Sequence, residues 1–475
     1  MILPRRLLLA LLGGLGVVAL VFPVNALAHG IVGKADLPIP VWLFSWAAAI
    51  VLVVSFVALS ALWTHPQLQA PRSRRLFRLP PALEWLASLA GLALFALVLY
   101  SGFAGAQESN ANFSVTFIYV VFWVGIPMLS VLFGDVFRAF SPWRTCARVL
   151  LALRGALAGQ RSRAPVLRYP ERLGMWPAVL GLIGFAWLEL VYVNRDQPSL
   201  LAALSLGYFL VMVAGMSLFG TEEWSERADG FGVYFGLMSR LSVLVRDEDG
   251  WVSLRRPLSG LTSLRIFPGT IGLICTIIGT TTFDGFSNGG IWRNNEPSLQ
   301  SFFSDLGLGQ TPALELAYSL GLVLCVALIA AVYRVGILGV RSVSGRYESS
   351  ELTRTFAHTL VPIGFAYVLA HYFSLLVWQS QAMVYLASDP LGDGSNLLGT
   401  NGYQIDYLFI SYAAIWYVQV AALIAGHVGG LALAHDRALV MYRNPQEAIR
   451  SQYWMLAVMV AFTSFGLWLL SAVGT

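Results

Sequence analysis

Long apolar runs, separated by shorter polar segments, cover most of the chain. Ten of these runs approach or exceed the roughly 20 residues that a helix needs to cross a bilayer. A run of this kind predicts a membrane-spanning helix, because a helix satisfies its own backbone polar groups in lipid. We therefore expect an all-α protein, a polytopic transmembrane helical bundle of about ten spans. The expected spans are residues 41–63, 82–103, 115–134, 175–193, 200–220, 264–284, 313–333, 355–386, 407–434 and 451–472.

The composition agrees with this pattern. Hydrophobic residues make up 57% of the 475 positions and charged residues only 12%, whereas about 25% of the residues in a soluble protein are charged. This shortage of charge excludes an ordinary cytosolic enzyme, a disordered protein and a disulfide-built secreted domain. The three cysteines form no CxxC pair, so no disulfide framework is expected. The lipid bilayer is the partner that the composition implies.

The first 28 residues have the features of a secretory signal peptide. A basic start precedes an apolar stretch, and Ala26 and Ala28 occupy the positions that signal peptidase requires to be small. Cleavage would leave residues 29–475 as a single integral membrane domain with His29 at its new amino terminus. A terminal histidine can chelate one metal ion through its amine and its ring, a chelate that copper(II) favours. Two alternatives stay open: the histidine merely follows the cleavage site, or the first helix is not removed.

Basic residues are distributed unevenly between alternate loops. If His29 lies outside, then Lys34, Arg195 and Arg293 are the only basic residues of the mature chain in outer segments. This is the positive-inside pattern, so we expect a multi-pass protein of the bacterial inner (cytoplasmic) membrane with an external amino terminus. Anionic lipid headgroups suffice to explain the basic inner face. No nucleic acid is therefore expected as a partner, and no pattern identifies a protein partner.

A few ionisable side chains fall within the expected spans or at their outer ends. Such groups are costly in a membrane, and each is a candidate for function. Glu189 and His371 lie in the outer parts of their helices, and Asp284 and Asp406 lie at outer helix ends. Together with His29 they could form a site just below the outer surface, with ligands that suit zinc, iron, manganese or copper. The alternative is a set of polar groups that are satisfied separately.

Four further patterns lead to structural expectations. The apolar stretch 231–245 is expected to be an interfacial helix, because it is short and contains Arg240. His435 and Asp436 are expected to form an interfacial cap on the inner side. Residues 285–312 are expected to form a long external loop. Small residues at every fourth position of the ninth span predict the close approach of another helix; they are Ala422, Gly426, Gly430 and Ala434.

The sequence contains none of the compact catalytic motifs GxSxG, GxxxxGK[ST] or HExxH. Longer stretches nevertheless resemble the bacterial membrane proteins called fenitrothion hydrolases, and the similarity extends through nearly the whole mature chain. These stretches are AHGIVGKADLPIPVWLFSWAAA at 28–49, FGDVFRAFSPWR at 133–144, TTFDGFSNGGIW at 281–292, FAHTLVPIGFAYVLAHYFSLLVWQ at 356–379, HVGGLALAHDRALVMY at 427–442 and RSQYWMLAVMVAFTSFGLWLL at 450–470.

This resemblance implies a membrane-bound hydrolase that cleaves organophosphorus triesters to a dialkyl (thio)phosphate and a nitrophenol. Such substrates are neutral, apolar small molecules, so they partition into lipid and could enter a pocket from the membrane. A divalent metal ion would activate the attacking water and polarise the phosphoryl group. The expected site residues are His29, His371, Asp284 and Asp406 as metal ligands and Glu189 as the catalytic base.

Two other hypotheses account for the same polar groups. A transporter or metal-handling permease would use them to pass an ion or a small solute, and the glycines at 269, 272 and 279 could interrupt the sixth span as in many transporters. A membrane scaffold in a copper or respiratory assembly system would use His29 to hold its metal. Against transport, the two halves of the chain have no obvious matching pattern.

Overall fold

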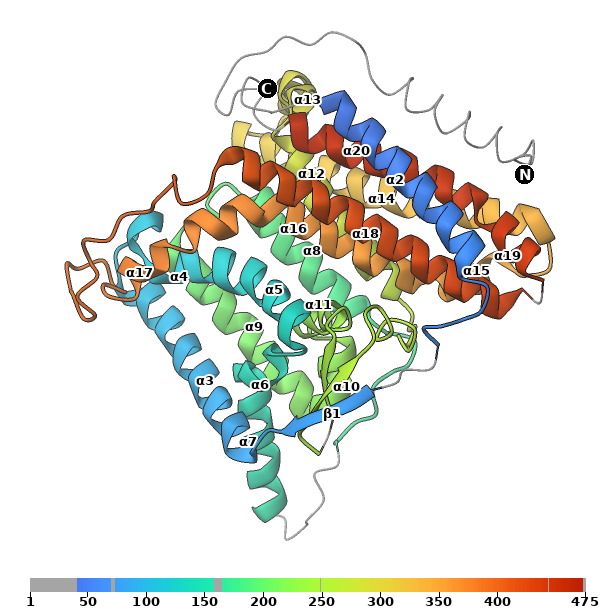
Figure 1. Cartoon of the computed structure of the whole chain (residues 1–475). Helices are drawn as coiled ribbons and strands as arrows, with labels where there is room; N and C mark the ends of the chain where they lie inside the picture. Colours follow the sequence, from blue (N-terminus) through green and yellow to red (C-terminus); the bar gives the residue numbers. More distant parts are fainter. Residues whose placement is uncertain (1–40, 70–72, 158–164, 248, 443, 473–475) are drawn as a thin grey trace.

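A computed structural model describes residues 41–69, 73–157, 165–247, 249–442 and 444–472 of the chain (Figure 1). The expected signal peptide and His29 lie outside the described residues. Within them, eight helices are long and apolar enough to cross a membrane, which confirms a helical, multi-pass membrane architecture. These candidate spans are Leu43–Leu62, Pro81–Ala104, Phe113–Phe133, Pro198–Phe219, Gln310–Val343, Ser349–Gln379, Tyr412–Met441 and Pro445–Leu469.

Several of these spans combine more than one helical element. The elements are α2 (Val41–Leu62), α3 (Pro81–Ala104), α4 (Phe113–Thr116), η3 (Phe117–Gly125), α5 (Ile126–Phe133), α9 (Pro198–Phe219), α14 (Gln310–Ser344), α15 (Ser349–Phe356), η4 (Ala357–Thr359), α16 (Leu360–Gln379), α18 (Tyr412–Met441), α19 (Pro445–Ser451) and α20 (Tyr453–Ala472).

Two of the expected spans form helices that do not belong to these eight. The expected span 175–193 corresponds to α8 (Trp176–Leu190), which has 15 residues. A helix of that length extends about 22 Å, whereas the hydrocarbon core of a bilayer is about 30 Å thick. The expected span 264–284 corresponds to α12 (Thr270–Ser287), which has 18 residues, most of them buried. Both segments are therefore helical, but length and composition alone do not identify them as spans.

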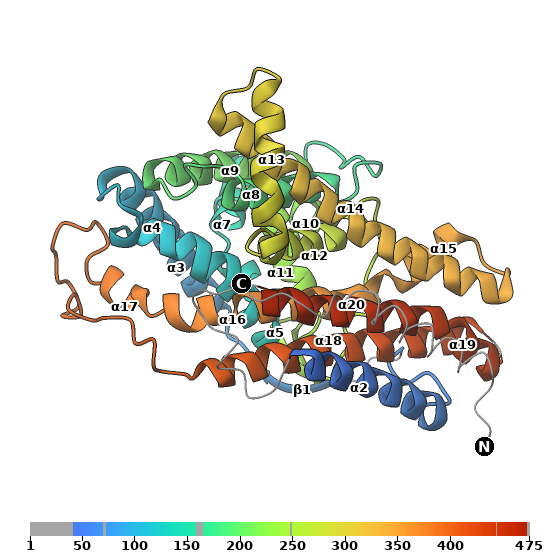
Figure 2. The same ribbon diagram turned by 90° about the horizontal axis from the view of Figure 1, so that it is seen from above.

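The helices form two groups that meet at α8 and α12 (Figures 1 and 2). In one group, α2 packs against α18 and α20, α14 packs against α12 and α20, and α16 packs against α12 and α18. In the other, α3 and α7 (Pro142–Leu157) pack against α9. Contacts of α8 with α12 and of α16 with η3 join the groups. The expected site residues on α12 and α16 therefore lie near this junction.

Small residues on α18 allow α16 to approach it closely, as predicted. A Cβ atom at Gly426 would lie 2.7 Å from the Pro362 carbonyl oxygen and 2.3 Å from Ala366 Cβ. A Cβ atom at Gly430 would lie 2.8 Å from the Thr359 carbonyl oxygen. Side chains at these positions would collide with backbone, so the contact depends on glycine.

The stretch expected to be an interfacial helix is buried instead. Most residues of α11 (Gly230–Ser239) are buried, and the helix packs against α5 and α8. Its amino-terminal cap, Asp229, accepts hydrogen bonds from Trp143 Nε1 at 2.6 Å and from the Tyr208 hydroxyl at 2.8 Å. The helix ends before Arg240, so the arginine that argued against a further span lies beyond the buried segment.

A three-stranded antiparallel sheet, which the sequence pattern did not predict, accompanies the helices. Its order is β1 (Ser73–Arg78), β3 (Trp251–Arg255) and β2 (Leu244–Arg246). The β2–β3 hairpin turns at Gly250, whose φ of 83° is a conformation that glycine adopts without strain. Because β1 follows α2 in the chain, its pairing with β3 joins two distant parts of the sequence.

His435 and Asp436, which were expected to form an interfacial cap on the inner side, are both buried. Asp436 has no exposed surface. It accepts hydrogen bonds from Trp63 Nε1 at 3.1 Å, from Gln69 Nε2 at 2.7 Å and from two backbone N–H groups of the same segment. His435 Nε2 lies 2.9 Å from the Trp63 carbonyl oxygen. The two residues therefore fasten the segment after α2 to α18.

The expected external loop 285–312 contains a helix, α13 (Gly290–Asp305), which packs against α14. Trp292 anchors this helix, since its ring lies where a side chain at Gly321 would otherwise be, with 2.5 Å to the nearest ring atom. The mostly polar composition of this segment did not indicate that Trp292 would pack in this way. The other short helices are η2 (Ser109–Ala111), α6 (Phe137–Phe140), α10 (Thr221–Arg227) and α17 (Ala382–Leu386).

One span includes a π-helix, η3, which extends over nine residues between α4 and α5. π-helical turns are rare and are wider than α-helical ones. Trp123 belongs to η3, and its ring centroid lies 4.7 Å from that of Phe185 and 5.1 Å from that of Tyr234. The π-helix therefore directs a large aromatic side chain toward α8 and α11.

Candidate functional site

His371 on α16 and Asp284 on α12 form a mostly buried pair. His371 Nε2 lies 2.8 Å from Asp284 Oδ2, and the two side chains are 17% and 16% exposed. Two of the residues expected in one site are therefore in direct contact. Asp284 was expected to end the sixth span, but α12 continues to Ser287, so the carboxylate projects from within the last turn of the helix.

Glycines allow the helices around this pair to pack closely. A Cβ atom at Gly279 would lie 2.6 Å from Val326 Cα on α14. A Cβ atom at Gly285 would lie 3.1 Å from Leu469 Cδ2 and 3.6 Å from His371 Nδ1. The missing side chain at Gly285 thus leaves room beside the imidazole.

The glycines do not interrupt α12 as the transporter hypothesis supposed. Gly272 and Gly279 lie within a continuous helix. Only Gly269 has a left-handed conformation, with φ of 89°, and it immediately precedes the first helical residue. In this chain the glycines serve close packing and the start of the helix.

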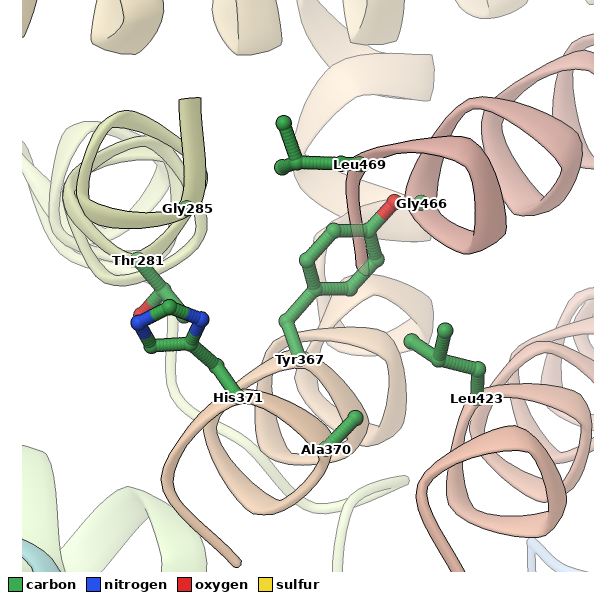
Figure 3. Close-up of a pocket in the computed structure, with 8 residues that line it drawn as sticks. All are labelled: Thr281, Gly285, Tyr367, Ala370, His371, Leu423, Gly466 and Leu469. Carbon is green, nitrogen blue, oxygen red and sulfur yellow. The ribbon is translucent and has the colours of Figure 1, made fainter. Parts of the chain in front are cut away.

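A small cavity lies beside His371 (Figure 3). Its volume is ≈ 10 Å³, which is about enough for one water molecule. When Nε2–H donates to Asp284, the other ring nitrogen, Nδ1, keeps a free lone pair. Nδ1 lies on the Gly285 side, where this cavity is found. The residues lining it are Thr281, Gly285, Tyr367, Ala370, His371, Leu423, Gly466 and Leu469.

Aromatic and acidic side chains surround the pair elsewhere. The Tyr372 ring centroid lies 4.7 Å from that of His371, and the Tyr372 hydroxyl is within hydrogen-bonding reach of Asp284. Glu189, near the end of α8, interacts electrostatically with Asp284 and lies next to Trp123. Glu189 Oε2 is a buried oxygen with no hydrogen-bond partner within the described part of the chain. Glu189 therefore lies near the pair, as expected, without bonding to it directly.

Asp406 makes its contacts elsewhere. It was expected to end the ninth span, but α18 begins only at Tyr412, so Asp406 lies in the preceding loop. Its carboxylate accepts the Leu408 N–H at 2.8 Å, and its own N–H donates to Gln381 Oε1 at 3.0 Å. Across the described ranges, neither His371 nor Asp284 is among its hydrogen-bond partners.

The residues that the structure describes contain no group of three or more histidine, cysteine, aspartate or glutamate side chains placed to hold a metal ion. His371 and Asp284 offer two ligands, but they are bonded to each other. A protein zinc site uses three or four ligands. The described residues therefore fit an acid–base pair rather than a complete metal centre, and His29, the expected terminal ligand, lies outside them.

The sequence patterns missed three residues of this region, Tyr372, Trp123 and Tyr367. Tyr372 directly follows His371, so its proximity could have been inferred from the chain alone. Trp123 comes from a different span, and its placement depends on the π-helix, which no sequence pattern indicated. Tyr367 lies one turn before His371 and lines the same cavity.

No protein-family model, curated protein sequence or solved structure matches the chain.

Proposed function

We propose that this protein is a membrane-embedded hydrolase of apolar organophosphorus triesters, in which the Asp284–His371 pair activates the attacking water. The observation that carries the proposal is the arrangement of the imidazole. Its Nε2 is held by a carboxylate at 2.8 Å, and its Nδ1 lies beside a cavity of water size. A carboxylate that orients a histidine and stabilises its charged form is a recurrent feature of general-base catalysis.

In the proposed reaction, His371 Nδ1 removes a proton from water while the water oxygen bonds to phosphorus. The bond from phosphorus to the aryl oxygen breaks, and a nitrophenolate leaves with that electron pair. Asp284 stabilises the imidazolium until the proton passes to solvent or to the product. The substrate class comes from the sequence resemblance, and the apolar surroundings suit a neutral triester that enters from lipid.

A divalent metal ion would be an alternative to this base mechanism, because the imidazole has only one lone pair, which can bind a metal or accept a proton but not both. Zinc, copper, iron or manganese at His371 and Asp284 would polarise the phosphoryl oxygen and supply a more acidic water. Further ligands would be needed, and His29 is the candidate that the sequence offers. No step above requires this ion.

The test is turnover of paraoxon and fenitrothion by protein purified in lipid nanodiscs. We expect Asp284→Asn and His371→Gln to lower kcat roughly 10²–10⁴-fold, the usual range for general acid–base catalysis. Asp406→Asn serves as the matched control and should keep full activity if the pair acts alone. Unchanged thermal unfolding would show that each variant is folded.

The same assay separates a metal-dependent reaction from a metal-independent one. Loss of activity with chelator, restored by one metal, would support a metal at the pair. Full activity in both pair variants would reject the catalytic role of the pair, and no turnover by the wild-type protein would reject the hydrolase proposal.

A proton-coupled transporter is the second candidate, and the size of the cavity favours it. A space of ≈ 10 Å³ accepts a water or a proton without rearrangement, whereas a triester needs the helices to separate. Protonatable groups within spans are typical of proton relays. Pyranine-loaded proteoliposomes separate the candidates: proton flux that Asp284→Asn abolishes, with no turnover of either triester, would support transport.

The proposed topology is ten spans in the bacterial inner membrane, with the mature amino terminus outside. The eight long helices are supplemented by α8 and α12. The supporting observations are the burial of α12 among its neighbours and the distribution of arginine between alternate loops. A signal peptide over residues 1–28 completes this topology.

A further inference from the structure

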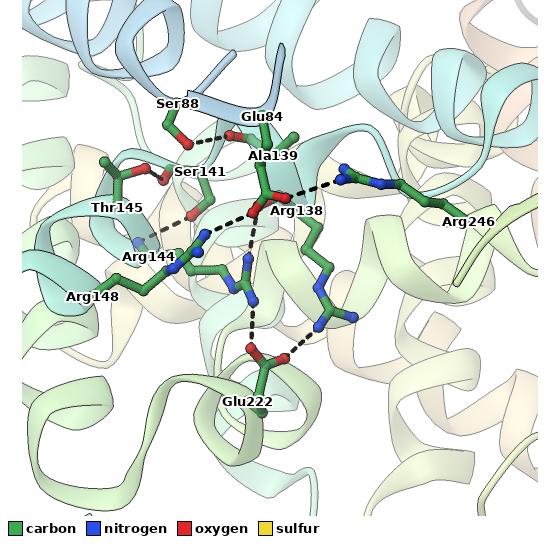
Figure 4. Close-up of polar contacts among 10 residues, drawn as sticks. All are labelled: Glu84, Ser88, Arg138, Ala139, Ser141, Arg144, Thr145, Arg148, Glu222 and Arg246. Carbon is green, nitrogen blue, oxygen red and sulfur yellow. Dashed lines mark hydrogen bonds and ion pairs between the residues drawn. The ribbon is translucent and has the colours of Figure 1, made fainter. Parts of the chain in front are cut away.

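Four arginines and two glutamates form a cluster at the end of α3 (Figure 4). Glu84, in the first turn of α3, pairs with Arg148 Nη1 at 2.7 Å and with Arg246 Nη2 at 3.0 Å. Glu222 on α10 pairs with Arg138 Nη2 at 2.7 Å and also with Arg144. Elements α3, α6, α7, α10 and β2 therefore all meet at one polar site.

The charges of this arginine cluster do not balance. Each carboxylate bonds to two guanidinium groups, so these six side chains carry a formal surplus of two positive charges. Asp135, which interacts electrostatically with Arg138 and Arg144, leaves at least one of them uncompensated. A guanidinium group has five N–H donors, and the contacts to glutamate use only part of them. The surplus charge and the remaining donors are suited to an anionic ligand with several oxygen acceptors.

Three of the arginines remain accessible. The side chains of Arg138, Arg148 and Arg246 are 51%, 36% and 35% exposed. Arg144 is almost completely buried, and it donates to the Arg138 carbonyl oxygen at 3.2 Å. The buried arginine therefore holds the cluster together, while the other three present cationic groups to the surroundings.

One exposed aromatic side chain adjoins these cations, and other exposed apolar side chains lie on the same helices. Trp85 is 55% exposed, and its ring centroid lies 5.7 Å from the Arg148 guanidinium carbon. Leu86 and Leu89, on the same helix, are 62% and 59% exposed, and Leu153 on α7 is 55% exposed. A cationic site bordered by a lipid-facing apolar surface has the two chemical parts of a phospholipid, a phosphate and acyl chains.

We propose that the arginine cluster binds the headgroup of an anionic phospholipid. Arg138, Arg148 and Arg246 would donate hydrogen bonds to phosphate oxygens, and the acyl chains would lie along the exposed leucines of α3. A lipid is favoured over free inorganic phosphate because the apolar surface would otherwise have no role at this position. Basic pockets beside membrane helices are known sites for such headgroups.

The experiment measures lipid binding to the full-length protein in detergent by native mass spectrometry. The probes are phosphatidylglycerol, cardiolipin, phosphatidylcholine and inorganic phosphate. We expect both anionic lipids to bind more tightly than phosphatidylcholine. Each juxtamembrane arginine contributes about 1 kcal/mol, so Arg138→Gln or Arg246→Gln should weaken anionic-lipid binding about fivefold.

Arg341→Gln is the matched control. Arg341 is a partly exposed arginine at the end of α14, paired with Glu348 at 3.6 Å, and its loss should leave the affinity unchanged. Equal weakening by all three variants would indicate nonspecific charge and overturn the site. Equal binding of phosphatidylcholine, or competition by inorganic phosphate alone at equal concentration, would also overturn it. Thermal unfolding of each variant without lipid identifies any variant that has lost its fold. If Arg138→Gln does not fold, the comparison of Arg246→Gln with Arg341→Gln decides the test.

Discussion

Asp436 is a carboxylate without exposed surface, and the hydrogen bonds that it accepts from described residues come from the segment after α2. Its two oxygens accept four donors, two from side chains and two from the backbone. Removing an acceptor of this kind leaves buried donors unsatisfied, and each such donor costs about 1–3 kcal/mol.

We expect Asp436→Ala to lower the free energy of unfolding by roughly 3 kcal/mol or more, because several donors lose their partner at once. Chemical denaturation in detergent measures the loss, and limited proteolysis should show earlier cleavage near residue 67. Asp305→Ala, an exposed residue at the end of α13, should change stability by less than about 0.5 kcal/mol. Equal stability of Asp436→Ala and the wild type would contradict this role.

Individual side chains of the site were predicted with partial success. The placement of Asp284 beside His371 agrees with their expected depth in two different spans. Asp406 had a similar apparent depth, but its span begins later than hydropathy indicated, because apolar and aromatic residues continue into the preceding loop. Hydropathy measures how apolar a segment is, and it contains no information on where the hydrogen bonds of a helix begin.

At the scale of elements, the sequence predicted which helices pack closely better than it predicted which helices are buried. The repeat of small residues on α18 correctly indicated a close neighbour, which is α16. The burial of α11 and the three-stranded sheet were not predicted. Both depend on contacts between parts of the chain that are far apart in sequence, and local patterns do not carry that information.

The contact of α16 with α18 provides a test at this scale. We expect Gly426→Val to lower the free energy of unfolding by about 1–3 kcal/mol, the usual cost of overpacking, because its Cβ would lie 2.7 Å from the Pro362 carbonyl oxygen. Since α16 carries His371, the same variant should also reduce any activity that depends on the pair.

Gly207→Ala on α9 is the control for this substitution. A Cβ atom there would meet no other atom within 4 Å, so helix propensity predicts a stabilisation of about 0.5–1 kcal/mol. Thermal and chemical unfolding of both variants provide the comparison. A neutral effect of Gly426→Val would mean that the two helices can separate without cost.

For the molecule as a whole, the membrane architecture was predictable because apolar length is a direct physical requirement of the bilayer. Length and hydropathy alone do not give the number of spans. The helix α8 is shorter than a bilayer is thick, and α12 is less apolar than the eight long helices. Burial by neighbouring helices removes the need for such helices to be long and uniformly apolar.

The proposed orientation leads to a labelling prediction. In a variant with its three native cysteines replaced by serine, Asn295→Cys on α13 should react with a membrane-impermeant maleimide in spheroplasts. Arg346→Cys, in the exposed connection after α14, should react only after the membrane is permeabilised. The reverse pattern would show that the topology is inverted. Labelling of both positions in intact spheroplasts would reject the odd number of crossings that the proposed topology places between them.

The wide turns of η3 also restrict how the length of its span can change. In an α-helix each residue adds a rotation of about 100°, so the deletion of Val124 or Gly125, which lie between Trp123 and α5, would turn Trp123 relative to α5 by an angle of that order. The indole would then leave the neighbourhood of Tyr234 and Glu189, although every remaining residue would still be apolar enough for lipid. We therefore expect this span to accept many exchanges of one apolar residue for another. A change in the number of residues, by contrast, would alter the direction of the Trp123 ring.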